Sequence, residues 1–235
     1  MLIAIINQST LVSDADAVTM TQAVATQVRF DAAPLWERAP AAVIFYTDPK
    51  GVPPTAHGIA IVDTIQDQPK DVMGYHTEEH GGKLWGVVAA KPELDNGGTA
   101  MTGDWSVSTV LSHEVLEMFV DPNCNLWANN GKGSAYSFEV CDPVEAPSYT
   151  ISGVSVSNFV TPSWFDPLAP AGAQLDKLGH LTAPFSILKG GYVVYESAGK
   201  EQQKYGDEFP EWRKEMKAGP AARTQRRVGQ AHYGG

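Results

Sequence analysis

Residues 106–142 read SVSTVLSHEVLEMFVDPNCNLWANNGKGSAYSFEVCD, and the first part of this run is an apolar helix pattern with ionisable side chains set into it. His113 and Glu117 are four positions apart, so on a helix they project from one face and both can reach a single ion. Glu114 lies about 100° further round the same helix. Carboxylates are rarely buried unless they are paired or bind a metal, so this helix predicts a metal site.

The helix is predicted to begin after Ser106, which is suited to cap it, and to end near Val120. Asp121-Pro122 ends it, because proline disfavours helical backbone at the residue before it. The apolar residues at helical spacing are Val107, Val110, Leu111, Val115, Met118 and Phe119. The motif H-E-x-x-E differs from the zinc-protease helix motif H-E-x-x-H only at Glu117, which replaces the second histidine.

Runs of β-branched and other apolar residues before this helix predict a β-sheet. The expected strands are residues 2–7, 41–47 and 58–64, followed by a hairpin or strand pair of residues 73–80 and 83–91. Residues 14–30 carry apolar side chains at helical spacing, with Asp14 or Asp16 as the cap. The expected order is therefore strand, helix, two strands, a strand pair and then the helix with the H-E-x-x-E motif.

After that helix the chain is richer in strands and turns. Residues 123–133 are polar and predict a surface loop, whereas residues 135–141 are apolar enough to return to the core. Residues 149–160 predict a β-hairpin, and residues 190–196 predict a last strand. The expected fold class is α+β, with a mixed β-sheet, a backing helix and a β-rich C-terminal part.

The composition is that of a globular chain of 235 residues, with 43% hydrophobic and 19% charged residues. We expect one domain over residues 1–199 and a charged C-terminal tail or docking arm over residues 200–235. The formal charge of −10 argues against nucleic-acid binding, which needs a basic surface. Residues 200–227 are the exception, with eight Lys or Arg against five Asp or Glu. This tail is the segment expected to mediate oligomer or particle assembly.

The sequence also bears on where the protein works. No apolar run approaches the length of a membrane span, and the N-terminus lacks the cationic start and small-residue cleavage site of a signal peptide. A cytoplasmic protein is expected, with a virion as the alternative location. Cys124 and Cys141 are expected to be reduced thiols in that compartment, and a disulfide between them is the alternative for a protein outside the cell.

A hydrolytic zinc site needs three protein ligands, an open position for water and a carboxylate that accepts the proton of that water. His113 and Glu117 supply two ligands, and Glu114 is placed to act as the general base. Glu139 is the candidate third ligand, because it lies 22 residues past Glu117 on a segment that returns after a loop. Asp142 and Asp121 are the alternative ligands.

Two motifs carry a family resemblance, namely the H-E-x-x-E helix and the segment E-V-C-D-P at residues 139–143. Together with the element order before them, they resemble the zincin fold, and the pattern looks like zincin-like proteins of bacteria and their phages. The resemblance is carried by residues 105–143. It implies a metallopeptidase-like hydrolase with a peptide or protein substrate, with His113, Glu117 and Glu139 on the metal and Glu114 as the base. It also implies that residues 84–91 form the edge strand beside the substrate.

The replacement of the second helix histidine by Glu117 changes the expected chemistry. Two carboxylates and one imidazole put more negative charge on an ion than two imidazoles and one carboxylate, so bound water is less acidic and harder ions are favoured. Zinc is the first expectation, with calcium or manganese as alternatives. The competing function is a non-catalytic structural or interaction protein, such as a phage virion component, that keeps the fold.

Overall fold

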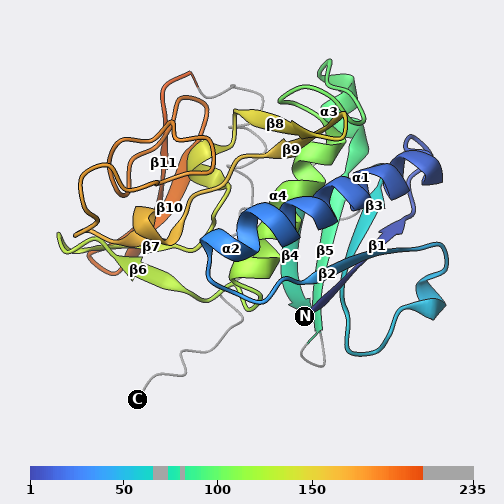
Figure 1. The fold of residues 1–235 in the computed structure, drawn as a ribbon, viewed down its shortest axis with the longest axis horizontal. Helices are drawn as coiled ribbons and strands as arrows, with labels where there is room; N and C mark the ends of the chain where they lie inside the picture. Colours follow the sequence, from blue (N-terminus) through green and yellow to red (C-terminus); the bar gives the residue numbers. More distant parts are fainter. Residues whose placement is uncertain (66–73, 80–82, 209–235) are drawn as a thin grey trace.

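The computed structural model describes residues 1–65, 74–79 and 83–208, with side chains for residues 1–65 and 85–208. The described chain has the expected α+β class: few helices accompany a largely parallel sheet, and a β-rich part follows (Figure 1). Most of the expected tail, residues 209–235, lies outside the described residues.

The main sheet has five strands in the order β2-β1-β3-β5-β4. Their bounds are β1 Leu2–Asn7, β2 Ala42–Tyr46, β3 His57–Val62, β4 Gly74–Glu79 and β5 Lys83–Ala89. All neighbouring strands pair in parallel except β4, which is antiparallel to β5. The five strands are therefore confirmed, close to their expected bounds.

The prediction that residues 84–91 form an edge strand of the sheet is wrong. Strand β5 pairs with β3 on one side and with β4 on the other, so β4 forms the edge of the sheet. The reason is the contrast between the two strands of the hairpin. The sequence of β5, KLWGVVA, is far more apolar than GYHTEE in β4, and the more apolar strand takes the interior position.

Helix α1, Asp14–Gln27, begins one residue earlier than its expected caps imply. Its cap is Ser13, whose hydroxyl accepts a hydrogen bond from the backbone N–H of Asp16, so the prediction of Asp14 or Asp16 as the cap is wrong. After Gln27 the backbone widens into a π-helical turn, η1, Val28–Ala32, followed by the short helix α2, Ala33–Leu35. Such π-turns are frequent at functional sites.

Helices α1 and α4, Val107–Val120, lie side by side against one face of the main sheet (Figure 1). A hairpin of β8, Ser148–Ile151, and β9, Val154–Ser157, also packs on these helices and confirms the hairpin expected there. One core contains Ile3, Ile5, Val43, Ile59, Ile61, Met20, Val24, Leu111, Val115 and Val156. Because α4 contacts both the sheet and β9, all 14 of its residues are buried.

Both ends of α4 are fixed by specific hydrogen bonds. At the start, Ser106 and Thr109 form a reciprocal capping box, which confirms the expected cap. At the end, Arg38 Nη1 donates to the carbonyl oxygens of Val120 at 2.6 Å and Phe119 at 3.3 Å. A cation in this position also complements the helix dipole. The helix that carries the motif is therefore held at both termini.

A second sheet of four antiparallel strands, in the order β11-β10-β7-β6, builds the C-terminal part. The bounds are β6 Trp127–Asn129, β7 Ser134–Ser137, β10 Tyr192–Ser197 and β11 Lys200–Tyr205. The expected loop at residues 123–133 therefore contains the short strand β6. The expected tail begins as β11, which pairs with β10 along its whole length.

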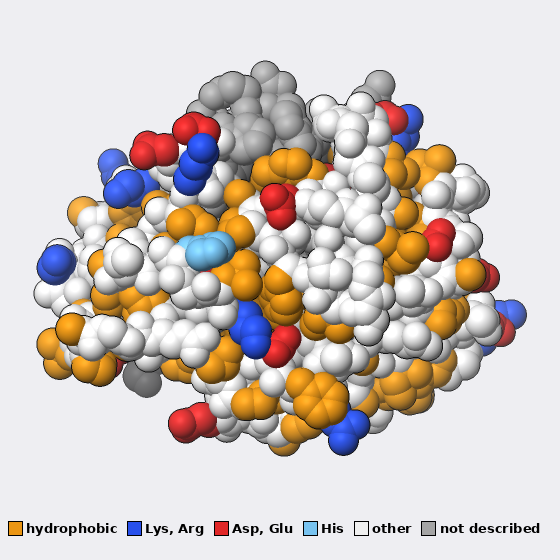
Figure 2. Space-filling view, turned by 45° about the horizontal axis from the view of Figure 1, so that its top comes forward, with side chains coloured by type: hydrophobic (Ala, Val, Ile, Leu, Met, Phe, Trp, Pro, Cys, Tyr) orange, Lys and Arg blue, Asp and Glu red, His pale blue; other side chains and the backbone are white. Residues whose placement is uncertain are grey.

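Short helical segments connect the strands. They are α3 Ala90–Asp95 and the 3-10 turns η2 Pro49–Gly51, η3 Asp142–Val144 and η4 Pro162–Phe165. Among the described residues, no helix is long and apolar enough to cross a membrane. On the face that Figure 2 shows, hydrophobic side chains are interspersed with acidic and basic ones. Cys124 and Cys141 are not joined in a disulfide.

Candidate metal centre

Helix α4 brings two ionisable side chains together one turn apart. Nε2 of His113 lies 3.1 Å from Oε1 of Glu117, and the side chains are 9% and 0% exposed. The expectation that these two residues project from the same helix face is confirmed. Their burial on an otherwise apolar helix means that each needs a polar or charged partner at this point.

The other half of the centre is the segment of residues 138–144, which follows β7. Three backbone hydrogen bonds hold this segment: Phe138 N–H to Leu126 at 3.1 Å, Val160 N–H to Val140 at 2.7 Å and Leu188 N–H to Pro143 at 2.9 Å. A Cβ atom at Gly191 would collide with the backbone oxygen of Pro143, so the close approach of β10 requires glycine there. These contacts fix the position of Cys141 and Asp142 relative to α4.

Side chains of this segment meet those of α4. Oδ1 of Asp142 lies 3.1 Å from His113 Nε2, and the backbone N–H of Cys141 donates to Glu117 Oε1 at 3.4 Å. His113, Glu117 and Cys141 offer ligand atoms within 4.8 Å of one another, and so do Glu117, Glu139 and Asp142. Two ligands of a tetrahedral zinc ion lie roughly 3.3 Å apart. This buried group could therefore bind a metal ion.

The geometry ranks the acidic ligands predicted from the sequence. Asp142, an alternative in the sequence, contacts His113 directly, whereas Glu139 groups with Glu117 and Asp142. Asp121 is buried at the C-terminal cap of α4, where its Oδ2 accepts a backbone hydrogen bond from the loop that follows. Within the part of the chain that the structure describes, Asp121 belongs to neither ligand group.

Cys141 is the ligand candidate that sequence reasoning missed. Its side chain is fully buried and within ligand range of both helix residues. The sequence feature that could have indicated Cys141 as a ligand is its position directly before Asp142 in the segment FEVCD, since a turn can present two successive side chains to the same helix.

Burial and the neighbouring carboxylates have opposite effects on the pKa of His113. Burial lowers the pKa of an imidazole, but the carboxylates of Glu117 and Asp142 outweigh it and raise the pKa of His113 to about 10. Without a metal, His113 is therefore an imidazolium between two carboxylates at neutral pH. A divalent cation would replace that proton and take up the same carboxylates.

The remaining ionisable groups respond to the same surroundings. Burial, reinforced by the charge of Glu117 and then by those of Asp142 and Glu114, raises the pKa of the Cys141 thiol. Glu114, the predicted base, is buried on α4 directly after His113.

Known proteins do not extend this description. No family model, curated protein or solved structure matches the chain. The chemistry that the centre can perform therefore has to follow from the positions and types of its side chains.

A buried hydrogen-bond network holds α4 next to the centre. Ser112 precedes His113, donates its hydroxyl to Gln27 Oε1 at 2.6 Å and accepts from the backbone N–H of Ser157 at 2.9 Å. Gln27 Nε2 donates to the Tyr149 hydroxyl at 3.1 Å and to the Ser157 carbonyl oxygen at 2.8 Å. The network thus joins α1 and the β8–β9 hairpin to α4, one residue from a ligand.

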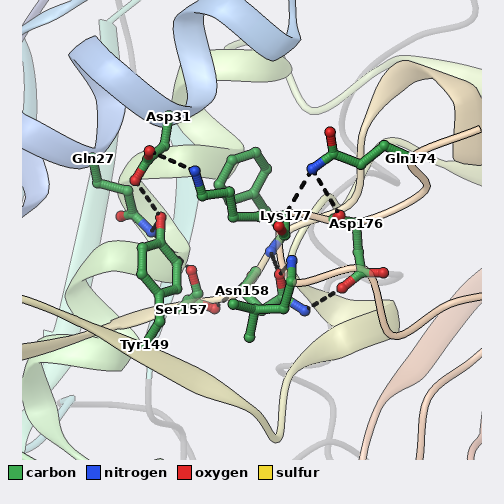
Figure 3. Close-up of polar contacts among 10 residues, drawn as sticks. Gln27, Asp31, Tyr149, Ser157, Asn158, Gln174, Asp176 and Lys177 are labelled. Atoms are coloured by element: carbon green, nitrogen blue, oxygen red, sulfur yellow. Dashed lines mark hydrogen bonds and ion pairs between the residues drawn. The ribbon is translucent and has the colours of Figure 1, made fainter.

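The network ends at a partly exposed ion pair (Figure 3). The Tyr149 hydroxyl donates to Asp31 Oδ2 at 2.8 Å, and Lys177 Nζ pairs with Asp31 Oδ1 at 2.6 Å. Burial, followed by the hydrogen bond to Asp31, raises the pKa of Tyr149, so the phenol remains a donor. Asp31 lies in the π-turn η1, which places its carboxylate between the other two side chains.

Gln27→Leu is expected to lower the free energy of unfolding by about 2–3 kcal/mol, because it removes the acceptor of the buried Ser112 hydroxyl and the side-chain donor to the Ser157 carbonyl oxygen. Denaturant unfolding measures this loss. Thr21→Val is the matched control on α1, since the buried hydroxyl of Thr21 donates to the Ala17 carbonyl oxygen of the same helix, and a loss below about 1 kcal/mol is expected. Equal losses in the two variants would contradict a bridging role for Gln27.

Proposed function

We propose that this protein is a metal-dependent hydrolase whose resident ion is zinc, held by His113, Glu117 and Asp142. The observation that carries the proposal is the pair of 3.1 Å contacts from His113 Nε2 to Glu117 Oε1 and to Asp142 Oδ1. Ligands of one small ion have this spacing. Glu114 directly follows His113 on the same buried helix, so a carboxylate that binds no metal is available beside the ligands.

Each residue has a distinct role in the proposed reaction. A bound zinc ion would polarise a substrate carbonyl and make water more acidic. Glu114 accepts the proton of the attacking water and delivers it to the leaving group. His113 acts as a neutral imidazole, because an imidazolium has no lone pair to offer a metal.

A peptide or protein is the proposed substrate. Strand β4 contacts α4 and forms an edge of the main sheet, and no other described strand pairs with its outer side. In zincins, an edge strand of this kind pairs with an extended peptide, and backbone hydrogen bonds to a sheet edge are a general mode of peptide recognition. In the proposed complex, β4 takes the place first expected for residues 84–91.

The choice of zinc over a harder ion rests on donor type. The nitrogen of His113 favours zinc, whereas the all-oxygen group of Glu117, Glu139 and Asp142 is of the kind that calcium or manganese prefers. Nε2 of His113 lies 3.1 Å from Oε1 of Glu117 and 3.1 Å from Oδ1 of Asp142, which favours an ion that accepts a nitrogen ligand.

The second candidate is a non-catalytic structural or interaction protein, such as a virion component, that holds a structural ion. The observation that favours it is burial: the side chains of Glu117 and Asp142 are 0% exposed, and that of His113 is only 9% exposed. Structural zinc sites are closed by protein ligands, whereas catalytic sites keep one position open.

Glu114→Gln separates the two candidates. For a hydrolase, we expect the variant to bind about one zinc per chain, as the wild type does, and to cleave peptides about 100-fold more slowly or worse. Metal analysis and mass spectrometry of a digested peptide library measure the two quantities. Glu196→Gln changes an exposed carboxylate on β10 and should cleave at the wild-type rate. If zinc binds but no peptide is cleaved by the wild type and left intact by Glu114→Gln, the hydrolase proposal fails and the structural candidate replaces it.

A further inference from the structure

The thiol of Cys141 has no role in a centre built from His113, Glu117 and Asp142, yet it lies among these ligands. Its sulfur is within 4.8 Å of ligand atoms of His113 and Glu117, and it lies 3.9 Å from the backbone carbonyl oxygen of His113. The side chain is fully buried. A buried thiol at this distance from an imidazole and a carboxylate matches a zinc ligand set in kind as well as in spacing.

The local backbone explains how Cys141 and Asp142 reach the same helix. Cys141 is the residue before the 3-10 turn η3 and has helical dihedral angles, φ −99° and ψ −25°. Its backbone N–H hydrogen-bonds to Glu117 Oε1, while the neighbouring Asp142 contacts His113 Nε2. The sulfur of Cys141 lies 3.9 Å from the backbone carbonyl oxygen of His113, so two successive side chains contact one turn of α4.

We propose that Cys141 is the fourth protein ligand of the ion, so that the ion takes up water only while the sulfur is released and turnover passes through that open state. The proposal rests on the proposed function, since it requires an ion held by His113, Glu117 and Asp142. As the ion binds, the thiol releases its proton to solvent and the sulfur bonds to the metal. Release of the sulfur takes a proton back from solvent and leaves one position open.

The proposal accounts for a centre that has both a hydrolytic motif and a high degree of burial. One nitrogen, two oxygens and one sulfur are the four protein donors that a closed structural zinc site requires. Loss of the sulfur alone converts the same site to three protein ligands and one open position, which is the arrangement of a catalytic site. The state of Cys141 therefore decides between the two candidate functions.

Cobalt(II) substitution of the purified full-length protein tests the ligand directly, because a thiolate bound to cobalt gives an intense near-ultraviolet charge-transfer absorption. We expect this band in the wild type, its loss in Cys141→Ser and its retention in Cys124→Ser. Cys124 is the matched control, since it is the other cysteine and lies outside both ligand groups of the described residues. Cys141→Ser should also weaken zinc binding about tenfold or more.

The closed state is tested with thiocyanate, a small anion that binds an open metal position. We expect the visible spectrum of the cobalt-loaded wild type to be unchanged by thiocyanate, and that of cobalt-loaded Cys141→Ala to shift. The far-ultraviolet circular dichroism of Cys141→Ala confirms that it is folded, and Cys141→Ser provides a second folded variant.

The outcomes distinguish this proposal from the one on which it rests. Cobalt binding without a thiolate band overturns the role of Cys141 and leaves the hydrolase proposal intact. A thiolate band together with a wild-type response to thiocyanate overturns the closed state. Failure of the wild type to bind cobalt or zinc overturns the metal centre itself, and the role of Cys141 with it.

Discussion

Asp142→Asn is expected to lower the zinc affinity about 1,000-fold, whereas Glu139→Gln is expected to lower it about 10- to 100-fold, the usual range for residues that only orient a ligand. The difference follows from the geometry, because Asp142 contacts His113 Nε2 at 3.1 Å and Glu139 is grouped only with Glu117 and Asp142. Both changes keep the size of the side chain and remove its charge. Competition with a chelator of known affinity measures each constant.

The control for this pair is Asp95→Asn, which removes an exposed carboxylate that pairs with Lys91 on α3. An exposed pair of this kind contributes little to stability, so the zinc affinity of Asp95→Asn should equal that of the wild type. If Glu139→Gln causes the larger loss, Glu139 is the third ligand, as the spacing in the sequence first suggested, and the assignment of Asp142 is wrong.

The metal-free protein is expected to lose stability as the pH rises from about 6.5 to about 10. The folded state raises the pKa of His113 from 6.5 to about 10, so the imidazolium stabilises the fold fully below pH 6.5 and this stabilisation is lost as the pH rises through the folded pKa. The loss is on the order of a few kcal/mol, since one pKa unit corresponds to about 1.4 kcal/mol. Urea unfolding in the presence of a chelator, across this pH range, measures it.

His113→Gln isolates the contribution of this one group. Glutamine keeps a hydrogen-bond donor near Glu117 and Asp142 but does not titrate, so the difference in pH dependence between the variant and the wild type reports His113 alone. Zinc affinity should show the opposite trend and increase over the same range, because the proton of His113 competes with the ion. Parallel pH profiles for the two metal-free proteins would contradict the raised pKa.

The helix with the motif was the most predictable element of the fold. Its cap at Ser106, its end at Val120 and the common face of His113 and Glu117 all depend on local signals, namely capping chemistry, proline and helical spacing. The strands β1, β2 and β3 were predictable for a similar reason, since each is a short apolar run between turn residues. Such features need no knowledge of the tertiary structure.

Features set by tertiary pairing were not predictable in the same way. The polar strand β11 has no apolar signal and exists because β10 offers it a partner. The position of β5 inside the sheet depends on which strands surround it, and the sequence of the hairpin leaves both orders open. Likewise, the choice between Glu139 and Asp142 depends on how β10 and Val160 hold residues 138–144, which are contacts between distant parts of the chain.

The division of the ligands between α4 and the segment after β7 gives a bound ion a mechanical role. Glu117 and Cys141 are 24 residues apart, and an ion that joins them cross-links the helix layer to the C-terminal sheet. Closing a loop of that size restricts the unfolded chain by roughly 3 kcal/mol in the chain-entropy view. Metal supply would then change the stability of the whole fold, and a chelator would lower it by a similar amount.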